Sequence, residues 1–373
     1  MQEYSLVIAS NFLDHYMMAL SNELKKYFKD FYFVASEKLE DDYKKLGFSD
    51  LNEIDYVFKA YENKSEADKL IQNADIVITG SYRYQSHIRK RAKNNKPILY
   101  YSERLFKDNS SIGKLLRYIK YNYRHMYDKN NPLLCVSAYA SGDYNSLGLF
   151  KDNTYKWGYF PEVKKYDINK LIQNKKKNSI LWVGRLVEWK HPMYAIEVAR
   201  KLKEMNYDFS MELIGTGELK ETIENKVKEY QLEEYITLFN NGMAPEEVRK
   251  HMENSEIYLF TSDRAEGWGV VLNEALNSGC ATVASYSAGS TPFLIDDNVN
   301  GMIYKNDNFN ELFEKTKYLL DNNKDKFAYK AYESISEKWN CDISAQRIYE
   351  YSKQIINNKE FIPYEDGILS KTG

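Results

Sequence analysis

Short apolar runs alternate with amphipathic stretches through the first 160 residues of the chain. The runs are rich in β-branched and aromatic residues, which favour strands, and the stretches between them are suited to helices. Runs such as residues 76–78 are apolar at every position, as expected of strands covered on both faces. The expected strands are residues 4–10, 31–35, 54–58, 75–80, 97–102 and 132–138. The pattern predicts βαβ units around a parallel sheet.

A second series of strands follows a polar interruption. Residues 164–178 are rich in Lys and Asn and can bury little apolar surface, so they are expected to form a linker. The stretch from about 324 to 359 has the apolar spacing of helices. Between these two segments, strand-like runs occur at residues 179–183, 210–214, 235–239, 256–261 and 281–285. The chain therefore predicts an α/β fold of two tandem, doubly wound, Rossmann-like domains.

The length of the chain supports this division, because 373 residues exceed what one hydrophobic core usually organises. We expect an N-terminal domain of residues 1–163, a linker of residues 164–178 and a second domain of residues 179–340. Residues 341–373 are expected to form a helical segment that packs back toward the N-terminal domain.

Composition and charge exclude several classes of protein. Hydrophobic residues make up 43% and charged residues 28% of the chain, which is ordinary globular usage. The formal net charge of -2 provides no general attraction for nucleic acid, and no nucleic-acid partner is expected. Three widely spaced cysteines without a C-x-x-C pair, together with no signal peptide and no long apolar run, favour a cytoplasmic protein with at most peripheral membrane contact.

Positive charge is concentrated in residues 81–130, which hold thirteen Lys or Arg residues against three acids. Within this region, residues 112–128 fit an amphipathic helix. Its apolar face would consist of Ile112, Leu115, Leu116, Ile119, Tyr123 and Met126, with Lys114, Arg117, Lys120 and Arg124 lying off that face. Two interpretations are open. The helix binds the anionic inner face of the cell membrane, or its apolar face packs on the N-terminal domain.

Two basic residues follow the first strand of the second series. Gly184 and Arg185 come directly after that strand, and Lys190 stands just before Pro192 opens a helix. Ligands of open α/β sheets bind beyond the carboxyl ends of the strands. Two cations beside a helix N-terminus suit the oxygens of a diphosphate, although a solvated basic loop is the alternative. The glycines at 215 and 217 indicate a tight turn, with or without a ligand.

Two glutamates follow the strand at residues 256–261. Glu266 is expected in the loop, and Glu274 in a helix that starts near Gly269. Because helical side chains lean toward the helix N-terminus, Glu274 can reach the cavity that Glu266 lines. Carboxylates accept hydrogen bonds from vicinal hydroxyls, so the pair suits sugars. The alternative is that both acids only stabilise a helix N-terminus.

These residues together resemble a known family. Val183-Gly184-Arg185 with Lys190, and Glu266-Gly267-Trp268-Gly269 with Glu274, look like the motifs of the retaining glycosyltransferase family 4, whose members have the GT-B fold. The resemblance is strong over most of residues 179–304. In the N-terminal half it covers only the order of strands and residues 135–137.

The resemblance implies a nucleotide-sugar site in the second domain and an acceptor side in the N-terminal domain. Arg185 and Lys190 would hold the donor diphosphate, Glu274 the ribose hydroxyls, and Glu266 the transferred sugar. Catalysis would rest on Glu266, Arg185 and Lys190. The implied donor-binding residues are Gly184, Arg185, Lys190, Glu266, Gly267, Trp268, Gly269, Val270 and Glu274. No cofactor and no metal are implied, and the chain contains no Asp-x-Asp.

The acceptor side departs from the pattern of this family. The glycine-rich turn that many relatives carry after the first strand is missing from residues 9–15, and residues 288–293 lack the acid that relatives commonly have there. Where relatives often have a histidine, this chain has Glu103 and Arg104. The acceptor-side candidates are His15, Glu103 and Arg104, although His15 also fits a structural hydrogen bond and Glu103 a structural ion pair with Arg104 or another base.

The expected function is transfer of a hexosyl group from a nucleoside-diphosphate sugar, with UDP as the expected nucleotide, to a sugar or a lipid-linked saccharide. The resemblance implies retention of configuration, and the expected context is bacterial surface polysaccharide or glycolipid synthesis. A sugar-nucleotide epimerase of the GT-B fold and a non-catalytic assembly protein are the alternatives. An NAD-dependent oxidoreductase is disfavoured, because neither domain has a G-x-G-x-x-G turn with an acid about 20 residues on.

Overall fold

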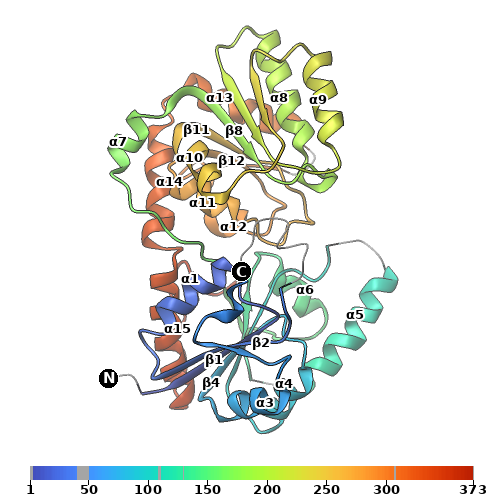
Figure 1. Cartoon of the computed structure of the whole chain (residues 1–373), viewed down its shortest axis with the longest axis vertical. Coiled ribbons are helices and arrows are strands. Elements are labelled where there is room, and N and C mark those ends of the chain that lie inside the picture. The colour runs from blue at the N-terminus through green and yellow to red at the C-terminus, as the bar shows by residue number, and fades with distance from the viewer. Residues whose placement is uncertain (1–2, 40–49, 108–110, 129, 306–307, 373) are drawn as a thin grey trace. The chain divides into compact units, whose positions relative to one another are not determined.

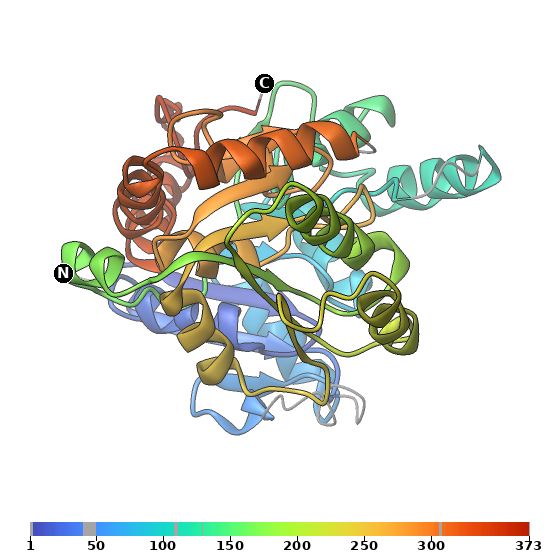
Figure 2. The same cartoon turned by 90° about the horizontal axis from the view of Figure 1, so that it is seen from above.

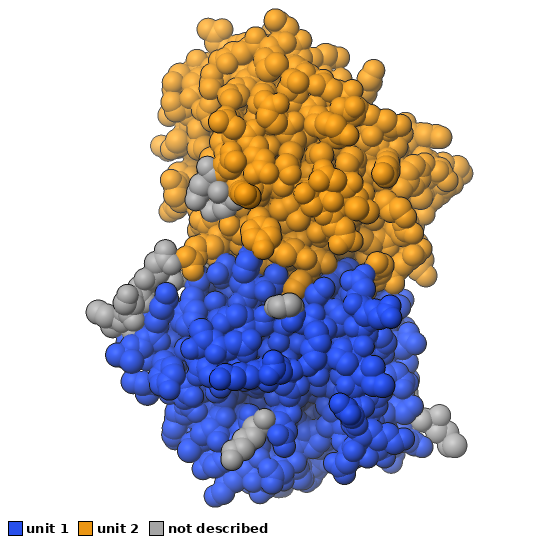
Figure 3. All heavy atoms as spheres, turned by 180° about the vertical axis from the view of Figure 1, so that it is seen from behind, with its two compact units in different colours: residues 1–162, 339–373 blue, residues 163–338 orange. Residues whose placement is uncertain are grey.

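The computed structural model describes the chain except for residues 1–2, 40–49, 108–110, 129, 306–307 and 373, and the side chains of residues 111 and 112. The chain divides into two compact units (Figure 3). Unit 1 consists of Met1–Glu162 and Trp339–Gly373, and unit 2 of Val163–Lys338. Each unit is built on a parallel β-sheet with helices around it (Figure 1).

The sheet of unit 1 has seven strands in the order β3-β2-β1-β4-β5-β6-β7. Neighbouring strands are parallel, so that Ile8 of β1 is paired with Phe33 of β2 and with Ile78 of β4. All three side chains are buried, which explains the continuous apolar runs. The strands are β1 (Ser5–Ser10), β2 (Asp30–Ala35), β3 (Val57–Lys59), β4 (Ile76–Thr79), β5 (Ile98–Ser102), β6 (Leu133–Cys135) and β7 (Thr154–Lys156).

The helices of unit 1 include one from each end of the chain. Helix α1 begins after Asp14, whose carboxylate accepts a hydrogen bond from the Met17 amide at 2.7 Å. Helix α15 packs beside α1, and the ring of its Tyr349 meets Phe28 edge-on at 5.3 Å. The helices are α1 (His15–Leu24), η1 (Leu51–Glu53), α3 (Lys64–Asn73), α4 (Gln85–Lys93), α5 (Ser111–Arg124), α6 (Ala140–Ser146) and α15 (Cys341–Ile356).

The sheet of unit 2 has six parallel strands in the order β10-β9-β8-β11-β12-β13. The chain passes from β8 to β9 and β10 on one side and to β11, β12 and β13 on the other, so β8 and β11 form the topological switch point. The strands are β8 (Lys176–Val183), β9 (Ser210–Ile214), β10 (Ile236–Phe239), β11 (Ser255–Phe260), β12 (Ala281–Ser285) and β13 (Met302–Tyr304).

The helices of unit 2 alternate with these strands. Three of them, α8, α10 and α12, have proline in the first turn, where the missing amide costs no hydrogen bond. The helices are α7 (Ile168–Gln173), η2 (Glu188–Lys190), α8 (Pro192–Glu204), α9 (Lys220–Glu229), α10 (Pro245–Asn254), α11 (Val271–Asn277), α12 (Thr291–Leu294), α13 (Phe309–Asp321) and α14 (Asp325–Glu337). Throughout the described part of the chain, every helix is too short or too polar to cross a lipid bilayer.

The two doubly wound parallel sheets confirm the predicted fold class. Each expected strand overlaps an observed one, and the sequence analysis missed only the edge strands β7 and β13 among those described. Each of these is a three-residue strand at an edge of its sheet.

Residues 164–178, which we expected to be a linker, are part of unit 2 and contain α7 and the first residues of β8. Lys175 is buried, and its ammonium donates hydrogen bonds to three backbone carbonyls. The acceptors are Met252 at 3.0 Å, Glu253 at 3.2 Å and Ser255 at 2.7 Å. The linker prediction was wrong because a Lys-rich composition does not show that one lysine caps the end of α10.

Helix α5 presents its apolar face to solvent. It extends along the outside of unit 1 (Figures 1 and 2). We call Leu115, Leu116, Ile119, Tyr123 and Met126 the α5 stripe, and each of these side chains is more than 50% exposed. The opposite face packs on unit 1 through the partly buried Tyr121 and the buried His125. The interpretation in which the apolar face packs inward was therefore wrong.

Replacement of Lys175 by alanine should remove the buried ammonium that donates to three carbonyls at the end of α10, of which those of Met252 and Ser255 also accept from the Cys280 thiol. We expect the free energy of unfolding of unit 2 to fall by about 2–4 kcal/mol. The matched change Lys177→Ala, at an exposed position two residues further along the chain, should alter it by less than about 0.5 kcal/mol. Urea titration followed by tryptophan fluorescence measures both, and equal stability of the two variants would contradict the assignment.

Candidate functional site

The candidate site lies at the switch point of unit 2, where β8 and β11 are neighbours. Connections leave these strands in opposite directions, which opens a crevice at their carboxyl ends. Gly184 and Arg185 follow β8 directly, and the loop of residues 261–269 follows β11. The structure thus brings the two sequence motifs to the same edge of one sheet.

Lys190 and Glu266 are in direct contact at this edge. The Lys190 ammonium forms an ion pair with the Glu266 carboxylate, and the two side chains are only 12% and 10% exposed. Ser262 Oγ donates a hydrogen bond to the same carboxylate oxygen at 3.1 Å. Both side chains keep some exposure. A phosphate group of a ligand could therefore replace Glu266 as the partner of Lys190, and a hydroxyl group of the ligand could replace Lys190 as the partner of Glu266.

Hydrogen bonds join the loops that follow β8 and β11. Thr261 Oγ1 donates to the carbonyl of Lys190 at 2.6 Å, and the Asp263 amide donates to the carbonyl of Trp189 at 2.9 Å. The indole of Trp182, buried in β8, donates to Thr261 Oγ1 at 2.8 Å. The position of the lysine therefore depends on backbone contacts with the loop after β11.

Trp189 lies between the two basic residues of the first motif. Its ring centroid is 5.3 Å from Cζ of Arg185 and 4.7 Å from Nζ of Lys190. The ring attracts both cations, which keeps the exposed Arg185 near the strand end. The sequence analysis did not single out this tryptophan, although it stands between the two basic residues in the chain.

Gly215 and Gly217 allow two backbone segments to approach closely. A Cβ atom on Gly215 would lie 1.8 Å from the carbonyl oxygen of Gly184, and one on Gly217 would lie 2.4 Å from that of Leu186. Only glycine fits at either position without displacing the loop after β8. The turn after β9 therefore supports the loop that carries Gly184.

The side chain of Trp268 has a structural position. It is 1% exposed, and its indole donates to Asn273 Oδ1 at 2.8 Å. The Trp268 carbonyl accepts a hydrogen bond from Ser290 Oγ at 2.6 Å. These bonds attach the loop to α11 and to the segment before α12, so the implied donor contact of Trp268 cannot come from its indole.

The neighbours of Trp268 form the turn into α11. Gly267 is buried, and Val270 is the partly buried residue that precedes the helix. Gly269 has a φ of +87°, and a Cβ atom there would lie 2.4 Å from the ring of Phe260. Glycine is therefore required at 269 for both conformation and space.

Glu274 lies in the first turn of α11 and is partly buried. Burial raises the pKa of its carboxyl above the usual value, and the positive charges of Arg249 and Lys164 oppose this shift. One turn later, Asn277 Oδ1 accepts hydrogen bonds from the Arg249 guanidinium and from the Lys164 amide, the latter at 2.9 Å. Two cations thus lie close enough to favour the carboxylate form of Glu274.

Tyr258 of β11 is close enough to both glutamates for their charges to act on its phenol. Burial raises the pKa of its phenol well above the usual value, and the negative charges of Glu274 and Glu266 contribute to that rise. Its hydroxyl donates to the carbonyl of Val183, the last residue of β8, at 3.3 Å. Both carboxylates are therefore within electrostatic reach of one hydroxyl beside the candidate site.

Glu103 lies in unit 1, directly after β5. Its carboxylate accepts a hydrogen bond from Tyr159 at 3.1 Å and pairs with Lys107 at 2.8 Å. The sequence left open a structural ion pair of Glu103 with Arg104 or with another base. The structure has a pair with another base, Lys107. Glu103 is therefore already held by two partners.

The other two acceptor-side candidates also lie in unit 1. Cζ of Arg104 is 4.7 Å from the ring centroid of Tyr139, and both Glu103 and Arg104 line a cavity of about 410 Å³. His15 is the first residue of α1, is partly buried, and is not among the residues that line this cavity. The structure thus places two of the three candidates in one cavity.

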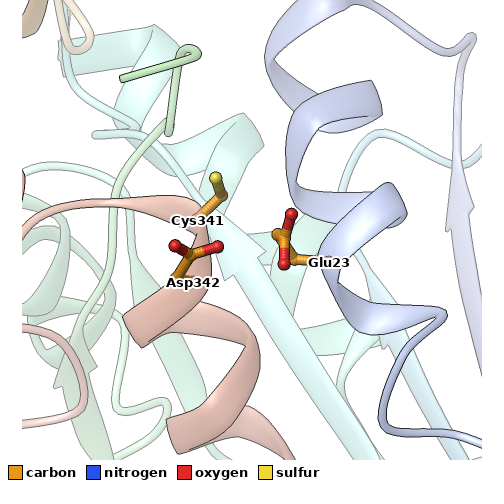
Figure 4. Close-up of side chains that lie close together, drawn as sticks. All are labelled: Glu23, Cys341 and Asp342. Atoms are coloured by element: carbon orange, nitrogen blue, oxygen red, sulfur yellow. The ribbon is translucent and has the colours of Figure 1, made fainter. Parts of the chain in front are cut away.

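Three possible metal ligands, Glu23 of α1 and Cys341 and Asp342 of α15, lie close together in unit 1 (Figure 4). Glu23 pairs with Lys26 at 2.5 Å. Burial, with the charges of Asp342 and Glu23, raises the pKa of the Cys341 thiol to about 11, so this thiol is protonated at neutral pH. A protonated thiol and an already paired carboxylate are poor ligands, and we assign no metal to this cluster.

A family model, described as glycosyl transferases group 1, matches residues 163–337. The match covers nearly the whole of unit 2, including both motifs of the candidate site. Unit 2 is thus similar to the glycosyl transferases group 1 domain. The ion pair of Lys190 with Glu266 lies within the matched region.

Two bacterial proteins are similar to part of this chain. The amylovoran biosynthesis glycosyltransferase AmsK of Erwinia amylovora is 30% identical over 192 residues, which are 49% of this chain and 46% of that protein. An N-acetylgalactosaminyltransferase of Campylobacter jejuni, named for a diphospho-undecaprenol substrate, is 28% identical over 236 residues, 60% of this chain and 62% of that protein. The chain thus spans about half to three fifths of the length of these relatives.

A solved structure shares the fold of both units. Anabaena Alr3699/HepE, determined in complex with UDP, matches 94% of this chain and 100% of its own, with a TM-score of 0.70 and 15% identity. This likeness establishes the GT-B fold, with its two Rossmann-like domains, for this chain.

The Lys190–Glu266 ion pair should show strong coupling in a double-mutant cycle. Lys190→Met alone leaves a largely buried carboxylate with Ser262 as its remaining partner, and we expect it to lower the free energy of unfolding by about 3 kcal/mol. The double variant Lys190→Met, Glu266→Gln should recover about 1–3 kcal/mol of this loss. Denaturant titration of the four proteins measures the coupling, and additive effects would contradict a direct pair.

Proposed function

We propose that the protein is a glycosyltransferase that transfers a hexosyl group from a nucleoside-diphosphate sugar to a saccharide acceptor, with retention of configuration. One observation carries this proposal. Lys190 and Glu266, from two separate motifs of the region that matches the glycosyl transferases group 1 model, meet at the switch point of the unit 2 sheet, with Arg185 on the same loop. UDP is the proposed nucleotide, supported by the solved relative with UDP bound.

Each charged side chain has a role in this proposal. Arg185 and Lys190 bind the diphosphate and stabilise the negative charge that develops on it as the sugar leaves. When Lys190 turns to phosphate, Glu266 is released to accept hydrogen bonds from the transferred sugar. Glu274 accepts hydrogen bonds from the ribose hydroxyls, with Arg249 and Lys164 favouring its ionised form. No metal is part of the proposal, because side-chain cations neutralise the diphosphate.

The proposed reaction exchanges one bond for another at the anomeric carbon of the sugar. The bond to the diphosphate oxygen breaks, and a bond to the acceptor oxygen forms on the same face. The acceptor hydroxyl proton passes to the departing phosphate. Orientation of the two substrates and stabilisation of the phosphate charge then account for catalysis, without a nucleophile from the protein.

The relatives support an acceptor used in bacterial surface polysaccharide or glycolipid synthesis. One of them is named for amylovoran biosynthesis, and another for a sugar linked to diphospho-undecaprenol. We therefore propose a sugar or a lipid-linked saccharide as the acceptor of this glycosyltransferase.

The α5 stripe supports peripheral contact with an anionic membrane. Its five apolar side chains are exposed together, and contiguous exposed apolar surface commonly marks an interaction site. Lys114 and Lys120 are exposed on the same helix, and Arg89 lies over the ring of Tyr123 at 4.5 Å. An apolar face flanked by cations matches the acyl and headgroup layers of an anionic bilayer. We propose this contact within residues 81–130.

Replacement of Lys190 by glutamine should lower kcat/KM for sugar transfer by about 100-fold or more, because one preorganised charge opposite the diphosphate is lost. Arg185→Gln should act in the same direction, and the exposed Lys177→Gln should leave activity within twofold. Transfer is measured as nucleoside-diphosphate release from a panel of UDP-sugars with saccharide acceptors. Near-normal turnover of the Lys190 variant, or interconversion of epimers without transfer, would refute the proposal.

Replacement of Leu116 and Ile119 by glutamate should reduce binding to vesicles that contain phosphatidylglycerol by at least about tenfold, since each apolar side chain contributes roughly 1.5–3 kcal/mol on burial. Ile362→Glu is the matched control, because Ile362 is 81% exposed and lies outside α5. Vesicle flotation measures the bound fraction, and added salt should lower it for the unmodified protein. Equal flotation of the α5 variant and the control would contradict membrane contact through the stripe.

A further inference from the structure

Arg249 of α10 is a buried arginine in unit 2. Only 6% of the residue is exposed, and a guanidinium removed from water in this way needs an opposite charge nearby. Its Nη2 donates a hydrogen bond to Asn277 Oδ1, and its Nε donates to the Tyr166 hydroxyl at 3.4 Å. Both partners are neutral, so these bonds hold the guanidinium in place without balancing its charge.

Tyr166 links the guanidinium to a neighbouring ion pair. Its hydroxyl donates to Glu253 Oε1 at 2.6 Å, and the same oxygen accepts from the Lys164 ammonium at 2.9 Å. Burial raises the pKa of Tyr166 to about 12, so the phenol keeps its proton at neutral pH. Because the one hydroxyl hydrogen goes to Glu253, the oxygen is left to accept from Arg249. Glu253 is thus matched with Lys164.

Glu274 is the second carboxylate near this cluster. Burial raises the pKa of its carboxyl, and among the charges that oppose this rise Arg249 acts more strongly than Lys164. Since Lys164 is in direct contact with Glu253, the two cations and the two acids balance when Arg249 serves Glu274. Each of these two groups then supplies the opposite charge that burial requires for the other.

Asn277 brings the guanidinium to the side of α11 that carries Glu274. The two residues are three positions apart, so they share one face of the helix, and the side chain of Asn277 leans toward the turn that holds Glu274. The carboxamide is fixed at both of its ends. Its Oδ1 accepts from the Lys164 amide at 2.9 Å, and its Nδ2 donates to the Lys164 carbonyl at 3.1 Å. The guanidinium bound to Oδ1 is therefore held one turn from Glu274.

We infer that Arg249 is a positioning residue of the nucleotide site: held by Asn277, its guanidinium supplies the countercharge of the Glu274 carboxylate and so makes the site select nucleotides with free ribose hydroxyls. The inference rests on the proposed function, in which Glu274 binds the ribose. Arg249 acts through Glu274 and needs no contact with the nucleotide. Without the guanidinium, burial drives Glu274 toward its protonated form, which accepts hydrogen bonds less strongly than a carboxylate does.

A purely structural role of Arg249 would have a different consequence. If the guanidinium only attached α10 to α11 and to Tyr166, its loss would disturb the whole nucleotide site, whatever the ligand. If it acts through Glu274, its loss affects only ligands that offer ribose hydroxyls. A nucleotide without these hydroxyls therefore separates the two roles.

Isothermal titration of the full chain with UDP and with dideoxy-UDP, which lacks both ribose hydroxyls, tests the inference. We expect Arg249→Gln to weaken UDP binding by about tenfold, because hydrogen bonds to a charged group give way to bonds to a neutral one. The affinity for dideoxy-UDP should change by less than about twofold, since that ligand makes no such bonds. Lys250→Gln, at the exposed next position of α10, is the matched control and should change both affinities by less than about twofold.

A second variant tests the same contact with Arg249 in place. Asn277→Asp gives the guanidinium a carboxylate partner of its own, so it should lower the preference for UDP over dideoxy-UDP in the same direction. This variant decides the matter should Arg249→Gln fail to fold. Equal weakening of UDP and dideoxy-UDP, or unchanged UDP binding in every variant of Arg249 and Asn277 that folds, overturns the inference.

The variant Glu274→Gln distinguishes this inference from the proposed function. It should remove the preference for UDP over dideoxy-UDP by itself. If Glu274→Gln loses this preference while the variants of Arg249 and Asn277 keep it, the inference alone is overturned. If Glu274→Gln keeps the full preference, or if UDP fails to bind the unmodified protein, the proposed function is contradicted and the inference falls with it.

Discussion

The parallel pairing of β8 with β11 is the constraint on which the candidate site depends. In this register Ile180 pairs with Ile257 and Leu181 with Tyr258, so the two strands end at the same edge of the sheet. The loops that follow them can then meet, and the pairing of Lys190 with Glu266 results. Residues 76 positions apart in the chain share one ion pair because two strands in different parts of the domain are neighbours.

The same principle explains how unit 1 holds a basic cavity in a protein with almost no net charge. Strands β4 and β5 end side by side, and the basic loop after β5 lies against the basic inner face of α5. Positive charges at this density repel one another, and the backbone contacts of Asp143 and Arg124 oppose that repulsion.

Helix α5 illustrates the limits of an amphipathic pattern. Its five exposed apolar side chains forgo the free energy that burial would contribute, because Tyr121 and His125 occupy the face that packs on unit 1. The helical spacing of apolar residues predicts that a helix has two different faces, yet it does not say which face turns inward. Here the inward face carries aromatic and basic residues, and the apolar face is left for a partner.

The sequence by itself determined the two doubly wound sheets, because buried parallel strands leave continuous apolar runs. It also determined which residues follow the strand ends, and therefore the candidate site in outline. Only the tertiary structure decided that Trp189 lies between two cations, that the Trp268 indole is buried, and that Lys175 caps α10. These outcomes depend on contacts between segments far apart in the chain, and local periodicity and composition carry no record of such contacts.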